Sequence, residues 1–501
     1  MASVRLTGGM QLDEKITGTG IPELDDILGG GIPRDRFFLV QGDPGAGKTT
    51  LGLQFLLAGA AQGETALYIS LSETRDEINA VAASHGWSLE GVALFELSAL
   101  EQSGSLEQDA SLFETSEIEL QETTRTLLAH IEKVKPLRVV FDSLSEVRLL
   151  SQSSLRYRRQ LLALKQYFTG KQITVLLLDD RTSEEGDPQL QSLANGVLTM
   201  EQIAPLYGED RRRLRVVKLR GRKFRGGYHD FLIRTGGLVV FPRLVAAEHR
   251  TEFKREAISS GLGPLDELLG GGLDRGTSTL IIGPAGTGKS ALALQYSMAA
   301  ARRGDSAAIY AFDETLPTLF ARAQGMGMDL SGEVKAGRLI VQGVDPAEMG
   351  PGEFSWTVRR AVEDQHARVV VIDTLNGYLN AMPEHRLLAV QMHELLSYLG
   401  QRGVATILVM AQHGMLGVTE SPVDVSYLSD TVILLRYFEA DGRIRKAISV
   451  VKKRSGPHED TIRELTLGRG GVRVGEVLRD FRGILSGMSQ SAGDAGELIR
   501  R

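Results

Sequence analysis

Two short segments have the residue types and spacing of a phosphate-binding loop. Residues 42–49, GDPGAGKT, and residues 283–290, GPAGTGKS, both fit the pattern G-x-x-x-x-G-K-[ST]. In such a loop, glycines let backbone N–H groups face a phosphate chain, the lysine reaches the β- and γ-phosphates, and the hydroxyl binds Mg²⁺. The predicted nucleotide contacts are Gly45, Ala46, Gly47, Lys48, Thr49 and Thr50, and in the second loop Gly286, Thr287, Gly288, Lys289, Ser290 and Ala291.

A carboxylate at the end of an apolar run is the second feature of each half. Asp142 and Asp373 each close a run that begins with Arg-Val-Val. A carboxylate at the carboxyl end of a strand beside a phosphate loop orients Mg²⁺. We therefore expect a metal site at Thr49 with Asp142, and another at Ser290 with Asp373. The alternative is that each aspartate caps the following helix.

A second carboxylate recurs after another apolar run of each half. Glu73 follows Ser72, and Glu314 follows Asp313. Hydrolysis of ATP needs a base that aligns water with the γ-phosphate, and a carboxylate one strand away from the loop can reach that position. Glu73, Asp313 and Glu314 are therefore candidate catalytic residues. The alternative is a carboxylate that merely stabilises a helix N-terminus.

A pair of basic residues lies near the end of each half, at Lys218 with Arg220 and at Lys452 with Arg454. Their i, i+2 spacing puts both charges on one face of a strand. Charges there either protect a solvated edge strand or reach a phosphate bound by a neighbouring subunit. The pattern alone does not choose between these two interpretations.

The two halves are copies of one module. The loop lysines are 289 − 48 = 241 residues apart, and the Gly-Gly-Gly turn before each loop repeats at the same offset. Helical segments alternate with short apolar strands, which predicts an α/β fold with mainly parallel sheets covered by helices on both faces. Alternating stretches with Gly turns over 214–240 and 431–478 predict antiparallel hairpins at the end of each module.

The repeat also sets the expected domain boundaries. We expect a leader over residues 1–15, a first domain over 16–245, a linker over 246–256, a second domain over 257–485 and a flexible tail over 486–501.

Composition excludes several classes of protein. The 501 residues suit two domains, and 57 basic against 63 acidic residues give a net charge of −6, which argues against a general nucleic-acid or membrane-surface binder. The chain has no cysteine, so disulfides and zinc–thiolate sites are excluded. Without a signal segment or a long apolar run, a soluble cytoplasmic protein is expected. The basic run 211–215 is either a solvated hairpin tip or a nucleic-acid contact.

Together, these features resemble the KaiC family within the RecA-like superfamily. The resemblance is carried by the paired loops, the Gly-Gly-Gly turns, the Ser-Glu-Thr and Asp-Glu-Thr strand ends, the Asp-Ser and Asp-Thr strand ends and the Lys-x-Arg strands. The resemblance covers about residues 16–487. It implies two tandem RecA-like P-loop domains that use ATP and Mg²⁺. It further implies a two-tiered homohexameric ring with ATP between subunits, in which the first tier hydrolyses ATP and the second is a serine/threonine autokinase.

The resemblance also assigns roles to residues. Asp313 would be the kinase-side base, while Ser72 stands where the family has a first carboxylate. Lys218, Arg220, Lys452 and Arg454 would contact the nucleotide of the neighbouring subunit. The phosphoacceptor pair of the family falls on Ser426 and Tyr427, of which Ser426 is the expected acceptor. Residues 481–487 resemble the C-terminal control loop, a KaiB-like partner is implied for the first tier, and a KaiA-like activator is left open.

Two other functions are compatible with these patterns. A RecA-like DNA-dependent ATPase or recombination accessory would use the basic run 211–215. A scaffold that assembles on ATP with little turnover would explain Ser72.

Overall fold

The computed structural model describes residues 15–96, 115–151, 153–181, 188–205, 207–379, 385–412, 426–484 and 490–491. The chain divides into two compact units, Met1–Arg243 and Leu244–Arg501. Within the segment 246–256, Ala246–His249 form the 3₁₀ helix η1, and the Ala246 amide donates a hydrogen bond to Glu394 Oε2 at 3.3 Å. This segment therefore packs on the second unit.

Each unit is built around one nine-stranded sheet, and the two sheets have the same strand order. The first sheet runs, from edge to edge, through β5 (Val92–Glu96), β4 (Ala66–Ser70), β6 (Arg138–Asp142), β7 (Thr174–Asp180), β3 (Phe37–Gly42), β8 (Gly196–Ile203), β9 (Arg211–Leu219), β10 (Tyr228–Arg234) and β11 (Gly237–Phe241). The second runs through β16 (Leu339–Gly343), β15 (Ser306–Ala311), β17 (Ala367–Asp373), β18 (Ala405–Ala411), β14 (Ser278–Gly283), β19 (Thr431–Ala440), β20 (Arg443–Lys453), β21 (Ile462–Gly468) and β22 (Gly471–Val477).

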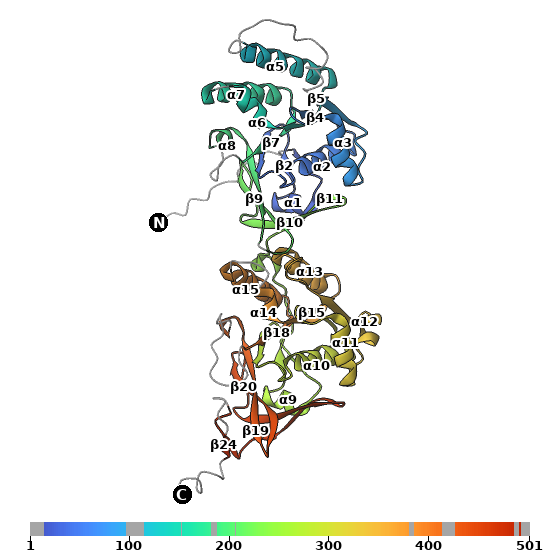
Figure 1. Ribbon diagram of the computed structural model, residues 1–501, viewed down its shortest axis with the longest axis vertical. Helices are drawn as coiled ribbons and strands as arrows, with labels where there is room; N and C mark the ends of the chain where they lie inside the picture. The colour runs from blue at the N-terminus through green and yellow to red at the C-terminus, as the bar shows by residue number, and fades with distance from the viewer. Residues whose placement is uncertain are drawn as a thin grey trace, which may run out of the picture. The chain divides into compact units, whose positions relative to one another are not determined.

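Helices cover both faces of each sheet, as the ribbon shows (Figure 1). In the first unit α1 (Pro22–Ile27), α2 (Lys48–Ala60) and α3 (Arg75–Ser84) pack on one face, and α5 (Thr115–Val134), α6 (Leu144–Leu150), α7 (Ser154–Gly170) and α8 (Pro188–Leu193) pack on the other. In the second unit α9 (Gly263–Leu268), α10 (Lys289–Arg302), α11 (Leu316–Gly325) and α12 (Leu330–Lys335) oppose α13 (Pro351–Glu363), α14 (Leu375–Leu379) and α15 (His385–Gln401). Because both faces are covered, the central strands are mostly apolar and their polar residues lie near the strand ends.

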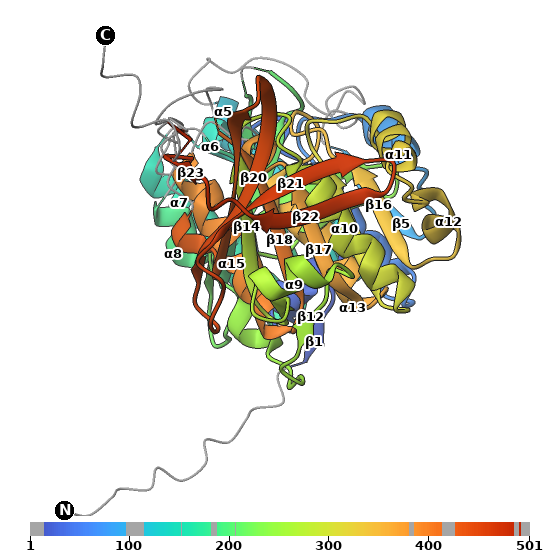
Figure 2. The same cartoon turned by 90° about the horizontal axis from the view of Figure 1, so that it is seen from below.

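The predicted fold class is confirmed. The strands from β5 to β8 are parallel, and β8 to β11 are antiparallel hairpins at the end of the sheet. The same arrangement holds from β16 to β22, and β20, β21 and β22 lie side by side in Figure 2. Two-stranded ribbons add β1 (Ile16–Thr17) with β2 (Ile32–Pro33), β12 (Ala257–Ile258) with β13 (Leu273–Asp274), and β23 (Phe481–Arg482) with β24 (Gln490–Ser491). None of the described helices has the length and apolar character needed to cross a membrane.

Candidate functional site

The two phosphate loops have the backbone that their glycines predict. Gly47 has φ 92° and Gly288 has φ 105°, a left-handed conformation in which a side chain is strained. A Cβ on Gly47 would also lie 2.7 Å from Ile233 Cδ1. Helices α2 and α10 begin at the next residue, so each loop passes directly into a helix whose N-terminus attracts anions.

Both loop lysines fold back over their own loop. Lys48 Nζ donates to the carbonyls of Gly42 at 3.0 Å and Asp43 at 2.9 Å, and it pairs with Asp180 Oδ1 at 2.8 Å. Lys289 Nζ donates to the Pro284 carbonyl at 2.8 Å, and burial lowers the pKa of this lysine. In each unit the ammonium group therefore lies beside carbonyls at the start of its own loop.

The loop hydroxyls contact the predicted aspartates. Thr49 Oγ1 donates to Asp142 Oδ2 at 3.0 Å, and Tyr68 OH donates to the same oxygen at 2.5 Å. Burial raises the pKa of Asp142, and the bonds from Tyr68 and Thr49 oppose that rise. Asp373 is likewise hydrogen-bonded to Ser290, and its pKa is raised by burial.

These hydroxyl–carboxylate pairs fit Mg²⁺. Mg²⁺ needs hard oxygen ligands and usually takes one or two carboxylates together with substrate phosphates rather than an all-protein cage. Accordingly, no group of three or more His, Asp or Glu side chains suited to a metal occurs among the described residues. Thr49 with Asp142, and Ser290 with Asp373, supply the protein's share of such a site.

The candidate base of the first unit lies among other carboxylates. Glu73 Oε2 is buried and has no hydrogen-bond partner among the described residues. Burial, followed by the charges of Asp142, Glu77 and Asp180, raises the pKa of Glu73. Its backbone is fixed by the Ser70 hydroxyl, which accepts from the Glu73 amide at 2.9 Å. A carboxylate with a raised pKa and an oxygen that has no hydrogen-bond partner is suited to accept a proton.

The second unit has a different arrangement at the same place. Both oxygens of Glu314 accept hydrogen bonds from Arg322, at 3.1 Å from Nε and 2.6 Å from Nη2. Asp313 Oδ2 accepts a bond from the hydroxyl of Thr374, which follows Asp373. The equivalent glutamates therefore differ in their partners: Glu73 has an oxygen without a hydrogen bond, whereas both oxygens of Glu314 are bonded to Arg322.

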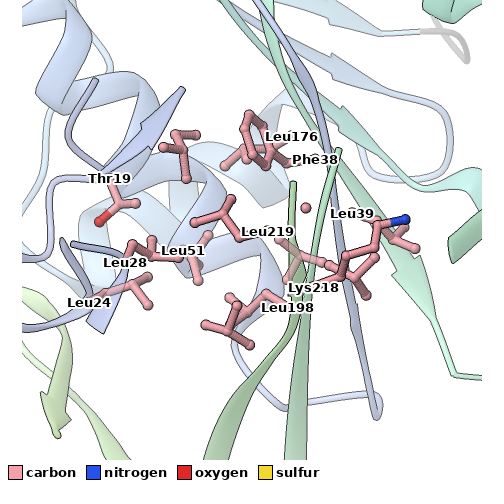
Figure 3. A pocket seen from close by; sticks show the side chains of 15 residues that line it. Thr19, Leu24, Leu28, Phe38, Leu39, Leu51, Leu176, Leu198, Lys218 and Leu219 are labelled. Carbon is pink, nitrogen blue, oxygen red and sulfur yellow. The ribbon is translucent and has the colours of Figure 1, made fainter. Parts of the chain in front are cut away.

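The basic pairs lie below their own loops, toward the amino ends of the strands that carry those loops. Lys218 in β9 pairs with Val197 in β8, which pairs with Leu39, whereas the loop leaves β3 at Gly42. The aliphatic stem of Lys218 borders an apolar cavity of about 40 Å³, and its amine points away from the cavity (Figure 3). That amine donates to the carbonyl of Gln191 at 2.5 Å.

The remaining members of the two pairs follow the same pattern. Arg220 Nη2 donates to the Ser192 carbonyl at 2.9 Å, Lys452 Nζ donates to the Ser429 carbonyl at 2.6 Å, and Arg454 lies 3.9 Å from Asp430. In β20, Lys452 pairs with Val432, level with Leu280 and below the loop that starts at Gly283. Neither pair reaches the phosphate loop of its own unit.

Other predicted residues are only partly described. Residues 426–428 form a short 3₁₀ helix, η2, in which Tyr427 is 55% exposed, while the side chain of Ser426 lies outside the described residues. Residues 1–14 of the predicted leader, residues 485–487 of the control loop and most of the tail also lie outside them. In the basic run, Arg213 Nε donates to Glu201 Oε2 at 2.7 Å and its guanidinium covers the Tyr228 ring at 4.1 Å.

Several residues at the sites were missed by sequence reasoning. Asp180 ends the apolar strand β7, the same signal that identified Asp142, so the pattern could have indicated it. Tyr68, Arg322 and Tyr437 had no such signal. The Tyr437 hydroxyl donates to the Ala285 carbonyl in the second loop at 2.9 Å, a contact that only the pairing of β14 with β19 creates.

The comparisons with known proteins agree with this geometry. The family model described as the KaiC ATPase matches residues 17–245 and again residues 258–479. The chain is 28% identical to the circadian clock oscillator protein KaiC of Parathermosynechococcus lividus, over 94% of this chain and 87% of that protein. It is 26% identical to the circadian clock protein KaiC3 of Synechocystis sp., over 94% of this chain and 93% of that protein.

Proposed function

Because the chain belongs to the KaiC family of ATPases, we propose that it assembles into a ring on ATP, hydrolyses ATP in its first unit and phosphorylates itself in its second. The observation that supports this most strongly is the contact of each loop hydroxyl with the aspartate at the end of a neighbouring strand, at 3.0 Å between Thr49 and the buried Asp142. A chance glycine turn would not bring these groups together in both units.

In the first unit, each residue has one task. Lys48 leaves its carbonyl partners to bind the β- and γ-phosphates, as loop N–H groups do. Thr49 and Asp142 would hold Mg²⁺, which would neutralise charge on the phosphates. Glu73 aligns a water molecule with the γ-phosphorus and accepts its proton, because its raised pKa and open oxygen favour that transfer.

Assembly follows from the position of the basic pairs. Lys218 lies level with Leu39, below the loop, and Arg220 lies near the amino end of β3. A phosphate that they bind would therefore belong to another copy of the chain. Such a head-to-tail contact closes into a ring when its rotation allows, and we propose the homohexamer of the KaiC family. Lys452 and Arg454 have the same role in the second unit.

In the second unit, we propose transfer of the γ-phosphoryl group to Ser426, with Asp313 as the base that accepts the hydroxyl proton. Ser426 begins η2, which ends shortly before strand β19 begins at Thr431. The same strand carries Tyr437, whose hydroxyl contacts the second phosphate loop. A role as a timing or signalling hub, and binding of a KaiB-like protein to the first unit, are further parts of this proposal.

The trans role of the basic pairs has a decisive test. Glu73→Gln chains and Arg220→Ala chains are each expected to lose about 99% of first-unit hydrolysis. When the two are mixed and assembled, about a quarter of the interfaces recover both intact residues, and activity returns accordingly. Glu90→Gln, which changes an exposed carboxylate between α3 and β5, is the control and keeps full activity. No recovery on mixing would refute a shared site.

The kinase half is tested by incubation with γ-labelled ATP and phosphopeptide mapping. Label in residues 421–431 that disappears in Ser426→Ala supports the proposal, and absence of label there removes it. Two other functions are separate outcomes of the same assays. Stimulation of hydrolysis by DNA with a steep salt dependence would indicate a DNA-dependent ATPase. Rings without turnover would indicate a scaffold.

A further inference from the structure

The two ATP sites differ in one cation. Arg322 lies on α11, eight residues after Glu314, and its guanidinium forms a two-bond pair with that carboxylate, at 3.1 and 2.6 Å. At the same offset of 241 residues, the first unit has Val81 on α3, eight residues after Glu73. Arg322 and Glu314 are both partly buried, so water screens their attraction less than it would at the surface.

The surrounding charges differ in the same direction. Glu73 faces the carboxylates of Asp142, Glu77 and Asp180, which raise its pKa. In the second unit Thr318 stands 241 residues after Glu77. Ala411 takes the place of Asp180, because it pairs with Gly283 as Asp180 pairs with Gly42. Burial raises the pKa of Asp373, and the charge of Arg322 opposes that rise. In the first site Glu73 therefore lies near three further carboxylates, of which Asp180 pairs with Lys48, whereas the second site contains an additional cation beside its metal-site aspartate.

We propose that Arg322 is a positioning residue that holds Glu314 out of ATP hydrolysis, so that the second site keeps ATP for phosphoryl transfer while the first site hydrolyses it. This inference rests on the proposed function of both sites. It leaves Asp313, whose partner is a hydroxyl rather than a cation, as the available carboxylate of the second unit.

The chemistry explains why the ion pair restrains hydrolysis. In hydrolysis, a water oxygen bonds to the γ-phosphorus while the bond from phosphorus to the bridging oxygen of ADP breaks, and the water proton passes to the carboxylate. Protonation of Glu314 would remove the negative charge that strengthens both of its bonds from the guanidinium, so the ion pair opposes transfer of the water proton to this carboxylate. Phosphoryl transfer to a serine by way of Asp313 meets no such opposition.

The test exchanges the residues between sites. In a Glu73→Gln background, which silences the first site, Arg322→Val is expected to raise ATP hydrolysis about tenfold through kcat, with little change in KM. Arg322→Lys keeps the charge but not the planar fork that makes both bonds, so its rate should lie between those of the parent and Arg322→Val. In the reverse exchange, Val81→Arg lowers first-unit hydrolysis about tenfold, whereas Val81→Met, a long uncharged side chain, keeps it.

A binding measurement gives a readout independent of turnover. The Mg²⁺ concentration that half-saturates binding of a fluorescent ATP analogue falls several-fold in Arg322→Val and not in Arg322→Lys, because the lost charge no longer opposes the metal near Asp373. Equal rates in Arg322→Val and its parent, or an unchanged first-unit rate in Val81→Arg, would overturn the inference. If the Glu73→Gln and Glu314→Gln changes both left hydrolysis of the parent chain intact, the proposed function itself would fail instead.

Discussion

Acidification should destabilise the first unit through one buried histidine, His229 in β10. The Arg243 amide donates to His229 Nδ1 at 2.8 Å, so the proton of the neutral ring is on Nε2, which donates to the Arg225 carbonyl at 3.0 Å. The ring is fully buried, and this burial lowers the pKa of His229 to about 4. These bonds anchor the segment that follows Arg220, one of the proposed phosphate contacts.

The sign and size of the effect follow from the two pKa values. Between pH 6.5 and 4 the unfolded chain binds a proton at this histidine and the folded chain does not, so stability falls as the pH falls through that window. A pKa displaced from about 6.5 to about 4 corresponds to about 3 kcal/mol, of which about 2 kcal/mol is lost by pH 5.

The two tryptophans allow a clean assay, because Trp87 lies in the first unit and Trp356 in the second. In a Trp356→Phe background, urea unfolding is followed by Trp87 fluorescence at pH 8 and pH 5. His229→Asn keeps an acceptor near the Nδ1 position and cannot titrate. Its stability should be lower at pH 8 but should fall by about 2 kcal/mol less on going to pH 5. Parallel pH dependences in the two proteins would refute the reasoning.

Three further changes have defined outcomes. Tyr68→Phe removes a bond that lowers the pKa of Asp142, so first-unit ATPase should be lost at a higher pH on the acid side of its profile, measured in a Glu314→Gln background. Arg138→Met removes the fully buried partner of Glu64, whose side chain is 10% exposed, and should cost the first unit about 3 kcal/mol in urea unfolding. Arg368→Met, at a half-exposed pair in β17, should cost less than about 1 kcal/mol. Gly47→Ala strains a φ of 92° and meets Ile233, so binding of a fluorescent ATP analogue to the first unit should be lost; unchanged binding would contradict the loop geometry.

Much of the fold could be predicted because its signals are local. The loops at 42–49 and 283–290, the apolar runs before Asp142 and Asp373 and the repeat of 241 residues all lie within short stretches of chain. A strand, a glycine turn and a helix start are specified by neighbouring residues, and the alternation of such units implies a parallel sheet. Helices α6 and α14, which follow the two aspartates directly, are short and were not predicted.

The amino-acid sequence by itself determined that this protein has two phosphate loops, each with a hydroxyl, a lysine and an aspartate of the right type. Tertiary structure decided which charges meet. The pairing of β8 with β9 puts Lys218 level with Leu39, below the loop that carries Lys48, and the packing of α11 brings Arg322 onto Glu314. These contacts depend on strand order, register and helix orientation, which bring together residues that no local pattern relates.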